Sequence, residues 1–141
     1  MGLVKEWNCL GFTCRVLDGP FHHYNGYIAV PKTHSAYGKN YSDLSIDVHG
    51  GLTFGEQGGT GNKEWPDPEL WWFGFDTSHC SDRIEYHSGD ISNPGGIRWT
   101  VEMVARECER MAEQFAEMCP IQSQDLKKTN IRIDGMLDGL P

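Results

Sequence analysis

A single amphipathic stretch near the end of the chain constrains the fold more than any other part of the sequence. Between Trp99 and Met118, apolar residues recur at the three- and four-residue spacing of one helix face. Thr100 suits the N-cap position, and Pro120 follows where the helix should end. An apolar helix face must be covered, and the preceding residues favour a sheet as its partner. The apolar face of this predicted helix consists of Val101, Val104, Ala105, Cys108, Met111, Ala112 and Phe115.

Short runs of β-forming residues, separated by turn residues, occupy the first two-thirds of the chain. Residues 11–17, 26–31 and 70–76 are predicted strands because they are rich in β-branched and aromatic side chains. Together with the helix, they predict an α+β fold in which a small antiparallel sheet of about four to six strands packs against one long C-terminal helix. We expect a single α+β domain over residues 1–120, followed by a polar tail or oligomerisation arm over residues 121–141.

A pair of adjacent glycines marks a turn in the middle of the chain. Residues 44–49 alternate strictly between apolar and polar side chains, which predicts a half-buried strand. The Gly50-Gly51 pair then predicts a tight hairpin to residues 52–54, since both central turn positions can need a positive φ. Residues 55–69 are rich in glycine but lack the spacing of a phosphate-binding loop. They are predicted to form a mobile loop that serves as a simple hairpin connection, with a flexible lid as the functional alternative.

The tryptophan-rich strand places two adjacent indoles on opposite faces. Trp71 shares one face with Phe73 and Phe75, whereas Trp72 shares the other with Gly74. One indole is expected in the core. The other is a candidate platform for stacking a ligand or for a subunit contact, and Trp72 is the residue expected to take this role. Gly74 leaves a bare spot on its face, where another group can approach the backbone closely.

Two histidines and two aspartates follow these strands and could meet at one end of the sheet. His49 precedes the glycine pair, Asp76 ends the tryptophan-rich strand, and His79 and Asp82 lie in the loop after it. Imidazoles beside carboxylates suit general acid–base catalysis, and His49, Asp76 and His79 also suit a divalent metal such as Zn²⁺, Mn²⁺ or Fe²⁺. The alternative is structural, because Asp76 and His79 can stabilise the turn after the strand by local hydrogen bonds.

Cationic and aromatic side chains indicate where a phosphorylated ligand could bind. Residues 32–43 include Tyr37 and Lys39, and rings can stack on a base while lysines bind a phosphate. An ordinary solvated loop with its tyrosines packed on the domain is the alternative. Arg83 and Arg98 are further cationic candidates. The predicted ligand-binding set is His49, Trp72, Asp76, His79, Tyr37, Lys39, Arg83 and Arg98.

Charge and composition exclude several classes of partner. The formal net charge is -8, so a nucleic-acid polymer would be repelled on average. No apolar run approaches the ~20 residues that a membrane-spanning helix needs, so no membrane partner is expected. The cysteines number 5 and show no Cys-x-x-Cys spacing, which indicates reduced thiols and a cytoplasmic protein. No cofactor is predicted, except a divalent metal in the alternative interpretation.

Three sequence motifs occur in a distinctive order. They are Gly-Tyr-x-x-Val-Pro at 26–31, His-Gly-Gly-Leu-Thr at 49–53, and Trp-Trp-Phe-Gly-Phe-Asp at 71–76, which is followed by His and Asp and then by the terminal helix. Over residues 26–118, this order resembles a family of small, mostly uncharacterised proteins encoded in bacteriophage and prophage genomes.

The resemblance implies a phage accessory protein, acting in the cytoplasm of the infected bacterial host. Small phage proteins of this size often counter host defence, and this analogy favours an anti-defence role. The leading hypothesis is a homo-oligomeric binding module that sequesters a small nucleotide-derived immune signal. The first alternative is a metal-dependent hydrolase of such a signal, in which His49, Asp76, His79 and Asp82 act as ligands or acid–base groups. The second is an inhibitor that docks on a host defence protein.

Overall fold

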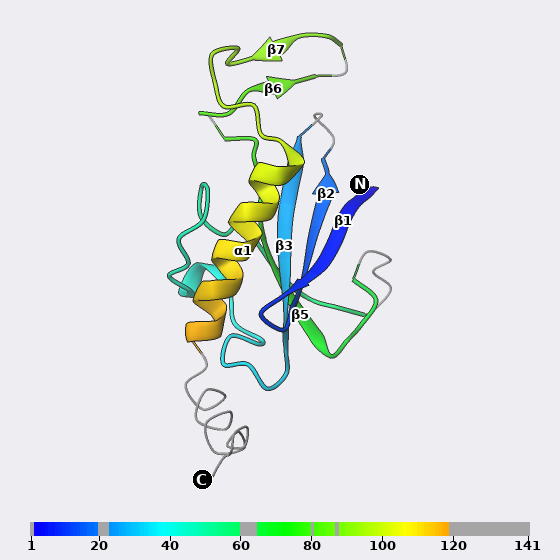
Figure 1. The fold of residues 1–141 in the computed structure, drawn as a ribbon, viewed down its shortest axis with the longest axis vertical. Coiled ribbons are helices and arrows are strands. Elements are labelled where there is room, and N and C mark those ends of the chain that lie inside the picture. Colours follow the sequence, from blue (N-terminus) through cyan, green and yellow to red (C-terminus); the bar gives the residue numbers. More distant parts are fainter. Residues whose placement is uncertain (1, 20–22, 60–64, 80, 87, 119–141) are drawn as a thin grey trace.

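Five antiparallel strands form a sheet, and one helix covers one of its faces (Figure 1). This computed structural model describes residues 2–19, 23–59, 65–79, 81–86 and 88–118. The predicted α+β fold, with a small sheet against one long C-terminal helix, is confirmed. Within the described residues the elements are β1 (Gly2–Cys9), β2 (Phe12–Asp18), β3 (Tyr24–Pro31), the 3₁₀ helix η1 (Tyr41–Asp43), β4 (Phe54–Gln57), β5 (Leu70–Phe75), β6 (Ile84–Glu85), β7 (Ile91–Ser92) and α1 (Val101–Glu117).

The strand order β1-β2-β3-β5-β4 places β3 at the centre of the sheet. The first three strands form a meander, and Ile28 of β3 lies opposite Cys14 of β2 and Phe73 of β5. β1 was not predicted, because it is an edge strand whose side chains are mostly exposed and show no apolar alternation. β6 and β7 pair separately from the sheet, and Figure 1 shows them beyond the start of α1.

The apolar face of α1 packs against the sheet, as the periodicity predicts. Met111 and Phe115 are fully buried, and the Phe115 ring stacks on Phe73 of β5 with 5.3 Å between ring centroids. The Thr100 hydroxyl accepts a hydrogen bond from the Met103 N–H, with 3.2 Å between oxygen and nitrogen, which confirms Thr100 as the N-cap. The start of the helix is thus held in place, and so are the residues immediately before it.

A second, smaller aromatic core lies on the other face of the sheet. Trp72 is 1% exposed there, because the Trp65 ring covers it at 4.6 Å between centroids and the Arg15 guanidinium lies 4.6 Å from its ring. Trp72 therefore presents no face to a ligand or a subunit, and the interpretation of this indole as a stacking platform is corrected to a core role. The expected close approach at Gly74 is confirmed, since the Tyr27 ring occupies the space that a Cβ atom would need.

The segment before the glycine pair differs from its prediction. Residues 44–49 form no strand, although Ile46 and Val48 are buried as the alternation indicates. Side chains of α1 take the place of a strand neighbour: Gln114 accepts a hydrogen bond from the Asp47 N–H and donates one to the Asp47 carbonyl, at 2.7 and 2.8 Å. An extended segment bonded in this way keeps a period of two without joining the sheet.

The predicted turn at the glycine pair is present, but the predicted hairpin is wrong. Gly50 and Gly51 have φ values of 68° and 79°, and the Gly51 N–H donates to the Val48 carbonyl at 2.8 Å. The chain then enters β4, which pairs with β5 and includes part of the predicted loop 55–69. Residues 60–64 of that loop and the predicted tail, residues 121–141, lie outside the described residues. Among the described helices, none is long and apolar enough to cross a membrane.

Candidate functional site

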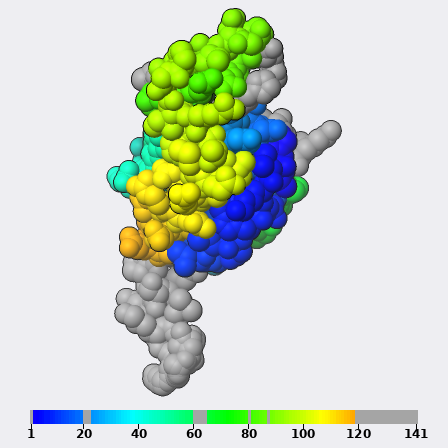
Figure 2. Space-filling model, turned by 45° about the horizontal axis from the view of Figure 1, so that its top comes forward, coloured from blue at the N-terminus to red at the C-terminus, as the bar shows by residue number. Residues whose placement is uncertain are grey.

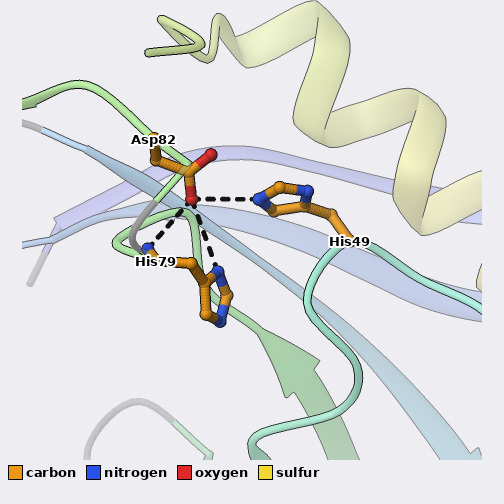
Figure 3. Close-up of side chains that lie close together, drawn as sticks. All are labelled: His49, His79 and Asp82. Atoms are coloured by element: carbon orange, nitrogen blue, oxygen red, sulfur yellow. Dashed lines mark hydrogen bonds and ion pairs between the residues drawn. The ribbon is translucent and has the colours of Figure 1, made fainter. Parts of the chain in front are cut away.

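The four residues expected to meet at one end of the sheet do come together. His49 arrives on the turn after residues 44–48, whereas Asp76, His79 and Asp82 follow β5. The His49 and His79 rings lie at 5.3 Å between centroids, and Figure 3 shows the Asp82 carboxylate directed at both. We call these four residues the His–Asp cluster.

Asp82 is the centre of the His–Asp cluster. Its side chain is fully buried, and one carboxylate oxygen, Oδ2, lies 2.9 Å from Nε2 of His49 and accepts a hydrogen bond from the His79 backbone N–H at 3.0 Å. The other oxygen, Oδ1, accepts from the Trp99 indole N–H at 2.9 Å. Burial alone raises the pKa of Asp82, but the hydrogen bonds from His49, the His79 backbone and Trp99 outweigh it and lower the pKa below its ordinary value. Asp82 is therefore held as a carboxylate.

His49 connects three parts of the fold. Its ring lies against the Trp99 ring at 4.3 Å between centroids, and its backbone N–H donates to Glu107 of α1 at 2.9 Å. The following residue, Gly50, has a positive φ, and a Cβ atom at this position would collide with the His79 ring. The glycine after His49 is thus required twice, once by the turn and once by the histidine that packs on it.

His79 lies between two carboxylates. Its Nε2 is 3.4 Å from Asp76 Oδ1, and its Nδ1 is 3.4 Å from Asp82 Oδ2. Asp76 Oδ1 also accepts hydrogen bonds from the backbone N–H and the hydroxyl of Ser78, both at 3.1 Å, so the local turn-stabilising role expected for Asp76 is confirmed. Nδ1 of His79 is buried, and among the described residues it has no hydrogen-bond partner.

Three donor atoms of the His–Asp cluster could hold a metal ion. His49, His79 and Asp82 each offer one, and these atoms all lie within 4.8 Å of one another. The metal set expected from the sequence named Asp76 as the carboxylate. In the structure that position belongs to Asp82, and Asp76 contacts His79 from the other side of its ring.

A cleft of about 960 Å³ adjoins the His–Asp cluster. The β6–β7 pair forms one wall and the first turn of α1 forms another, and Figure 2 shows this pair above the start of the helix. Trp99 belongs to both features, because it lines the cleft and its indole N–H is bonded to Asp82. The cleft is lined by Asp18, Gly19, His23, Tyr24, Thr77, Arg83, Glu85, Tyr86, Gly89, Ile91, Arg98, Trp99, Thr100, Val101 and Glu102.

The cationic candidates are divided between two ends of the molecule. Arg83 and Arg98 line the cleft, and both contact Glu85, at 2.9 and 3.0 Å. Tyr37 and Lys39 do not line it: they follow the far end of β3, an eight-residue strand that spans about 25 Å. The Tyr37 hydroxyl donates to the Pro68 carbonyl at 3.0 Å. This contact agrees with the alternative interpretation, in which the tyrosines of an ordinary loop pack on the domain.

Several cleft residues were missed by sequence analysis. Trp99 was assigned only to the start of the helix, and Tyr24, Glu85 and Tyr86 were assigned no role. A tryptophan immediately before an N-cap residue is the one local signal that was available, since such an indole can pack on the first turn and still use its N–H elsewhere. The contribution of β6 and β7 had no signal, because each has only two residues. Comparison with family models, curated proteins and solved structures finds no match to this chain.

Proposed function

We propose that this protein binds a small nucleotide-derived ligand in the cleft and sequesters it. The observation that supports this proposal is the composition of the cleft wall, where aromatic rings, two guanidinium groups and the start of α1 occur together. Tyr24, Tyr86 and Trp99 can stack on a base. Arg83 and Arg98 can bind phosphate oxygens in a bidentate manner, and the partial positive charge at the helix start adds to their attraction.

The carboxylates of the cleft suit the remaining part of a nucleotide. Asp18, Glu85 and Glu102 also line it, and carboxylates commonly accept hydrogen bonds from ribose hydroxyls. Glu85 keeps both arginines in place through ion pairs, so an incoming phosphate would compete with Glu85 for the two guanidinium groups. A ligand that carries a base, a sugar and a phosphate uses each kind of group in this wall.

The biological setting of the proposal rests on the resemblance to phage and prophage proteins. In that setting, the protein is an anti-defence accessory protein that keeps an immune signal away from its host receptor, and it acts as a homo-oligomer. The edge strand β1 supports the oligomer, because Leu3 and Val4 are exposed on it. Sedimentation or light scattering of the purified protein tests the oligomer separately from ligand binding.

The binding proposal is tested with a panel of nucleoside mono-, di- and triphosphates and cyclic mono- and dinucleotides. We expect at least one to bind in calorimetry and to be recovered intact after heat denaturation of the complex. Arg98→Gln and Arg83→Gln should weaken that binding at least tenfold. Arg110→Gln is the matched control, since this arginine is paired with Asp47 and Glu107 away from the cleft. A panel without any binder, or equal binding by all three variants, would contradict the proposal.

A metal-dependent hydrolase is the second candidate function. It is favoured by the three donor atoms of the His–Asp cluster. They lie beside the cleft, because Trp99 lines the cleft and is hydrogen-bonded to Asp82. A metal bound there could activate water for attack on a phosphate ester. A hydrolase should return cleaved nucleotide after incubation, and EDTA should stop the cleavage. Intact nucleotide in the presence of Zn²⁺, Mn²⁺ or Fe²⁺ excludes this candidate.

A further inference from the structure

We propose that His49 Nε2, His79 Nδ1 and Asp82 Oδ2 bind one divalent transition-metal ion, with Zn²⁺ as the reference ion. The inference goes beyond nucleotide binding and does not depend on it, because the site is complete without a cleft ligand. Two imidazole nitrogens and one carboxylate oxygen form a mixed donor set that suits Zn²⁺, Fe²⁺ and Mn²⁺. Three protein ligands also leave room for a water molecule in the coordination shell.

The donor atoms all lie within 4.8 Å of one another, so small side-chain movements would bring them around one shared ion. Two ligands at about 2.0–2.1 Å from a tetrahedral metal are themselves about 3.3 Å apart. Nδ1 of His79 lies 3.4 Å from Asp82 Oδ2, which is close to this separation. Nε2 of His49 lies 2.9 Å from the same oxygen as a direct hydrogen bond, so binding requires an opening of a few tenths of an ångström there and the loss of the shared proton.

The surroundings of His79 favour a metal ligand over an ordinary packed histidine. Asp76 lies 3.4 Å from its Nε2, so a proton on Nε2 has an acceptor and the lone pair is left on Nδ1. That Nδ1 is buried and, among the described residues, has no hydrogen-bond partner, although it faces the Asp82 carboxylate. A carboxylate behind a histidine is the usual second partner of a metal-binding imidazole. Asp76 is therefore a positioning residue for His79, not a ligand.

Contacts with neighbouring residues hold the donors of the His–Asp cluster in place. Asp82 is anchored by Trp99 through Oδ1 and by the His79 backbone N–H through Oδ2, and a second lone pair of Oδ2, now bonded to His49, would face the ion. Gly50 allows His79 to lie against the turn that carries His49. The site is also accessible, since the His49 and His79 side chains are 15% and 29% exposed.

The test is metal binding by the full-length protein without nucleotide. Protein dialysed against Zn²⁺ should retain one equivalent by elemental analysis, and Co²⁺ should give visible d–d bands without a thiolate charge-transfer band. Zn²⁺ should displace the Co²⁺ signal. Failure of the wild-type protein to bind either ion stoichiometrically overturns the inference, whatever the variants do. Nucleotide binding can fail or succeed independently of this result.

Variants assign the site to its residues. His79→Gln and Asp82→Asn should lower Zn²⁺ affinity at least a hundredfold, and Asp76→Asn should lower it about tenfold to a hundredfold through the orientation of His79. Asp90→Asn, an exposed carboxylate in the turn between β6 and β7, is the matched control and should bind as the wild type does. Circular dichroism verifies that each variant is folded. Full affinity in a folded His79→Gln variant would place the metal elsewhere and overturn the assignment.

Discussion

Asp82 shows how a single buried charge can organise a small protein. Removing a carboxylate from water is costly unless donors replace the lost hydration. Here three donors from three segments do so: the His49 ring, the His79 backbone and the Trp99 indole. The same three contacts join the turn after residue 48, the chain after β5 and the residue before the N-cap of α1. Asp82 is thus a structural link as well as a candidate ligand.

Replacement of this carboxylate tests its contribution to stability. Asp82→Asn should lower the free energy of unfolding at pH 7 by about 2–4 kcal/mol, because an amide cannot accept all three hydrogen bonds. The pKa of Asp82 is lowered from 3.8, so its stabilisation is present above about pH 4 and is lost as the pH falls through the folded-state value. The variant should therefore lose less stability than the wild type between pH 5 and about pH 2.

Urea denaturation at several pH values measures both effects. Asp90→Asn serves as the control, since Asp90 is exposed and its carboxylate accepts a local hydrogen bond from the Ser88 hydroxyl. An Asp82→Asn variant as stable as the wild type at pH 7, with the same loss of stability at acid pH, would show that this carboxylate does not hold the three segments together.

The two glycines after His49 offer a matched pair of substitutions. Both have positive φ, so alanine at either position carries a backbone cost of about 1 kcal/mol. A Cβ atom at Gly51 meets nothing within 4 Å, whereas one at Gly50 collides with the His79 ring. Gly50→Ala should therefore be more destabilising than Gly51→Ala by about 1–3 kcal/mol, as measured by thermal unfolding. It should also shift the His79 ring resonances in NMR spectra, and equal behaviour of the two variants would refute the close packing.

At the scale of elements, periodicity predicted burial better than it predicted hydrogen bonding. Residues 44–49 alternate as a strand does, and the burial of Ile46 and Val48 follows that alternation. Whether an extended segment joins a sheet depends on which partners its own backbone N–H and C=O groups find. Here the backbone N–H groups of Asp47 and His49 bond to the side chains of Gln114 and Glu107, more than fifty residues away along the chain, and not to a strand. A local sequence pattern cannot reveal such distant hydrogen-bond partners. The hairpin prediction at Gly50-Gly51 was wrong for this reason, since it assumed that residues 44–49 form a strand.

The small aromatic core on the face of the sheet opposite α1 leads to a prediction about a residue of β5. Trp72 fills this core with Trp65 and Tyr27, so Trp72→Ala should lower the free energy of unfolding by about 3–5 kcal/mol. Trp7→Ala is the control, since Trp7 lies on the edge strand β1 and is only partly buried, and its effect should be clearly smaller. Chemical denaturation compares the two. A stable Trp72→Ala variant with reduced nucleotide affinity would restore the stacking role that the burial of this indole removes.

At the scale of the whole molecule, the fold class was predictable and the spatial distribution of the site was only partly so. One amphipathic helix and several β-rich runs leave few arrangements, and the His–Asp cluster formed where the ends of two segments were expected to meet. The position of Tyr37 and Lys39 was not predictable. It depends on the direction of β3, which carries the chain from Tyr24 at the cleft to Pro31 at the other end.

The β6–β7 pair should be the least protected part of the described fold against hydrogen exchange. Each strand has two residues, and Ile91 and Ile97 are 42% and 45% exposed, so little apolar surface holds this region closed. Amides of Arg83 and Tyr86, bonded to Ile97 and Asp90, should exchange by local opening. Amides of Ile28 and Phe73 in the central strands should exchange only with global unfolding.

Hydrogen exchange also separates the roles of the cleft and of Asp82 in this region. Asp82 belongs to the His–Asp cluster and precedes β6 by two residues, so Asp82→Asn should speed exchange at Arg83 and Tyr86 more than its effect on global stability explains. A ligand bound in the cleft contacts the wall formed by the pair and should slow exchange at the same amides, in proportion to its occupancy. If ligand binding protected only the amides around Tyr37 and Lys39, the binding surface would lie at the opposite end of β3. The His–Asp cluster would then stabilise the fold without serving a neighbouring ligand site.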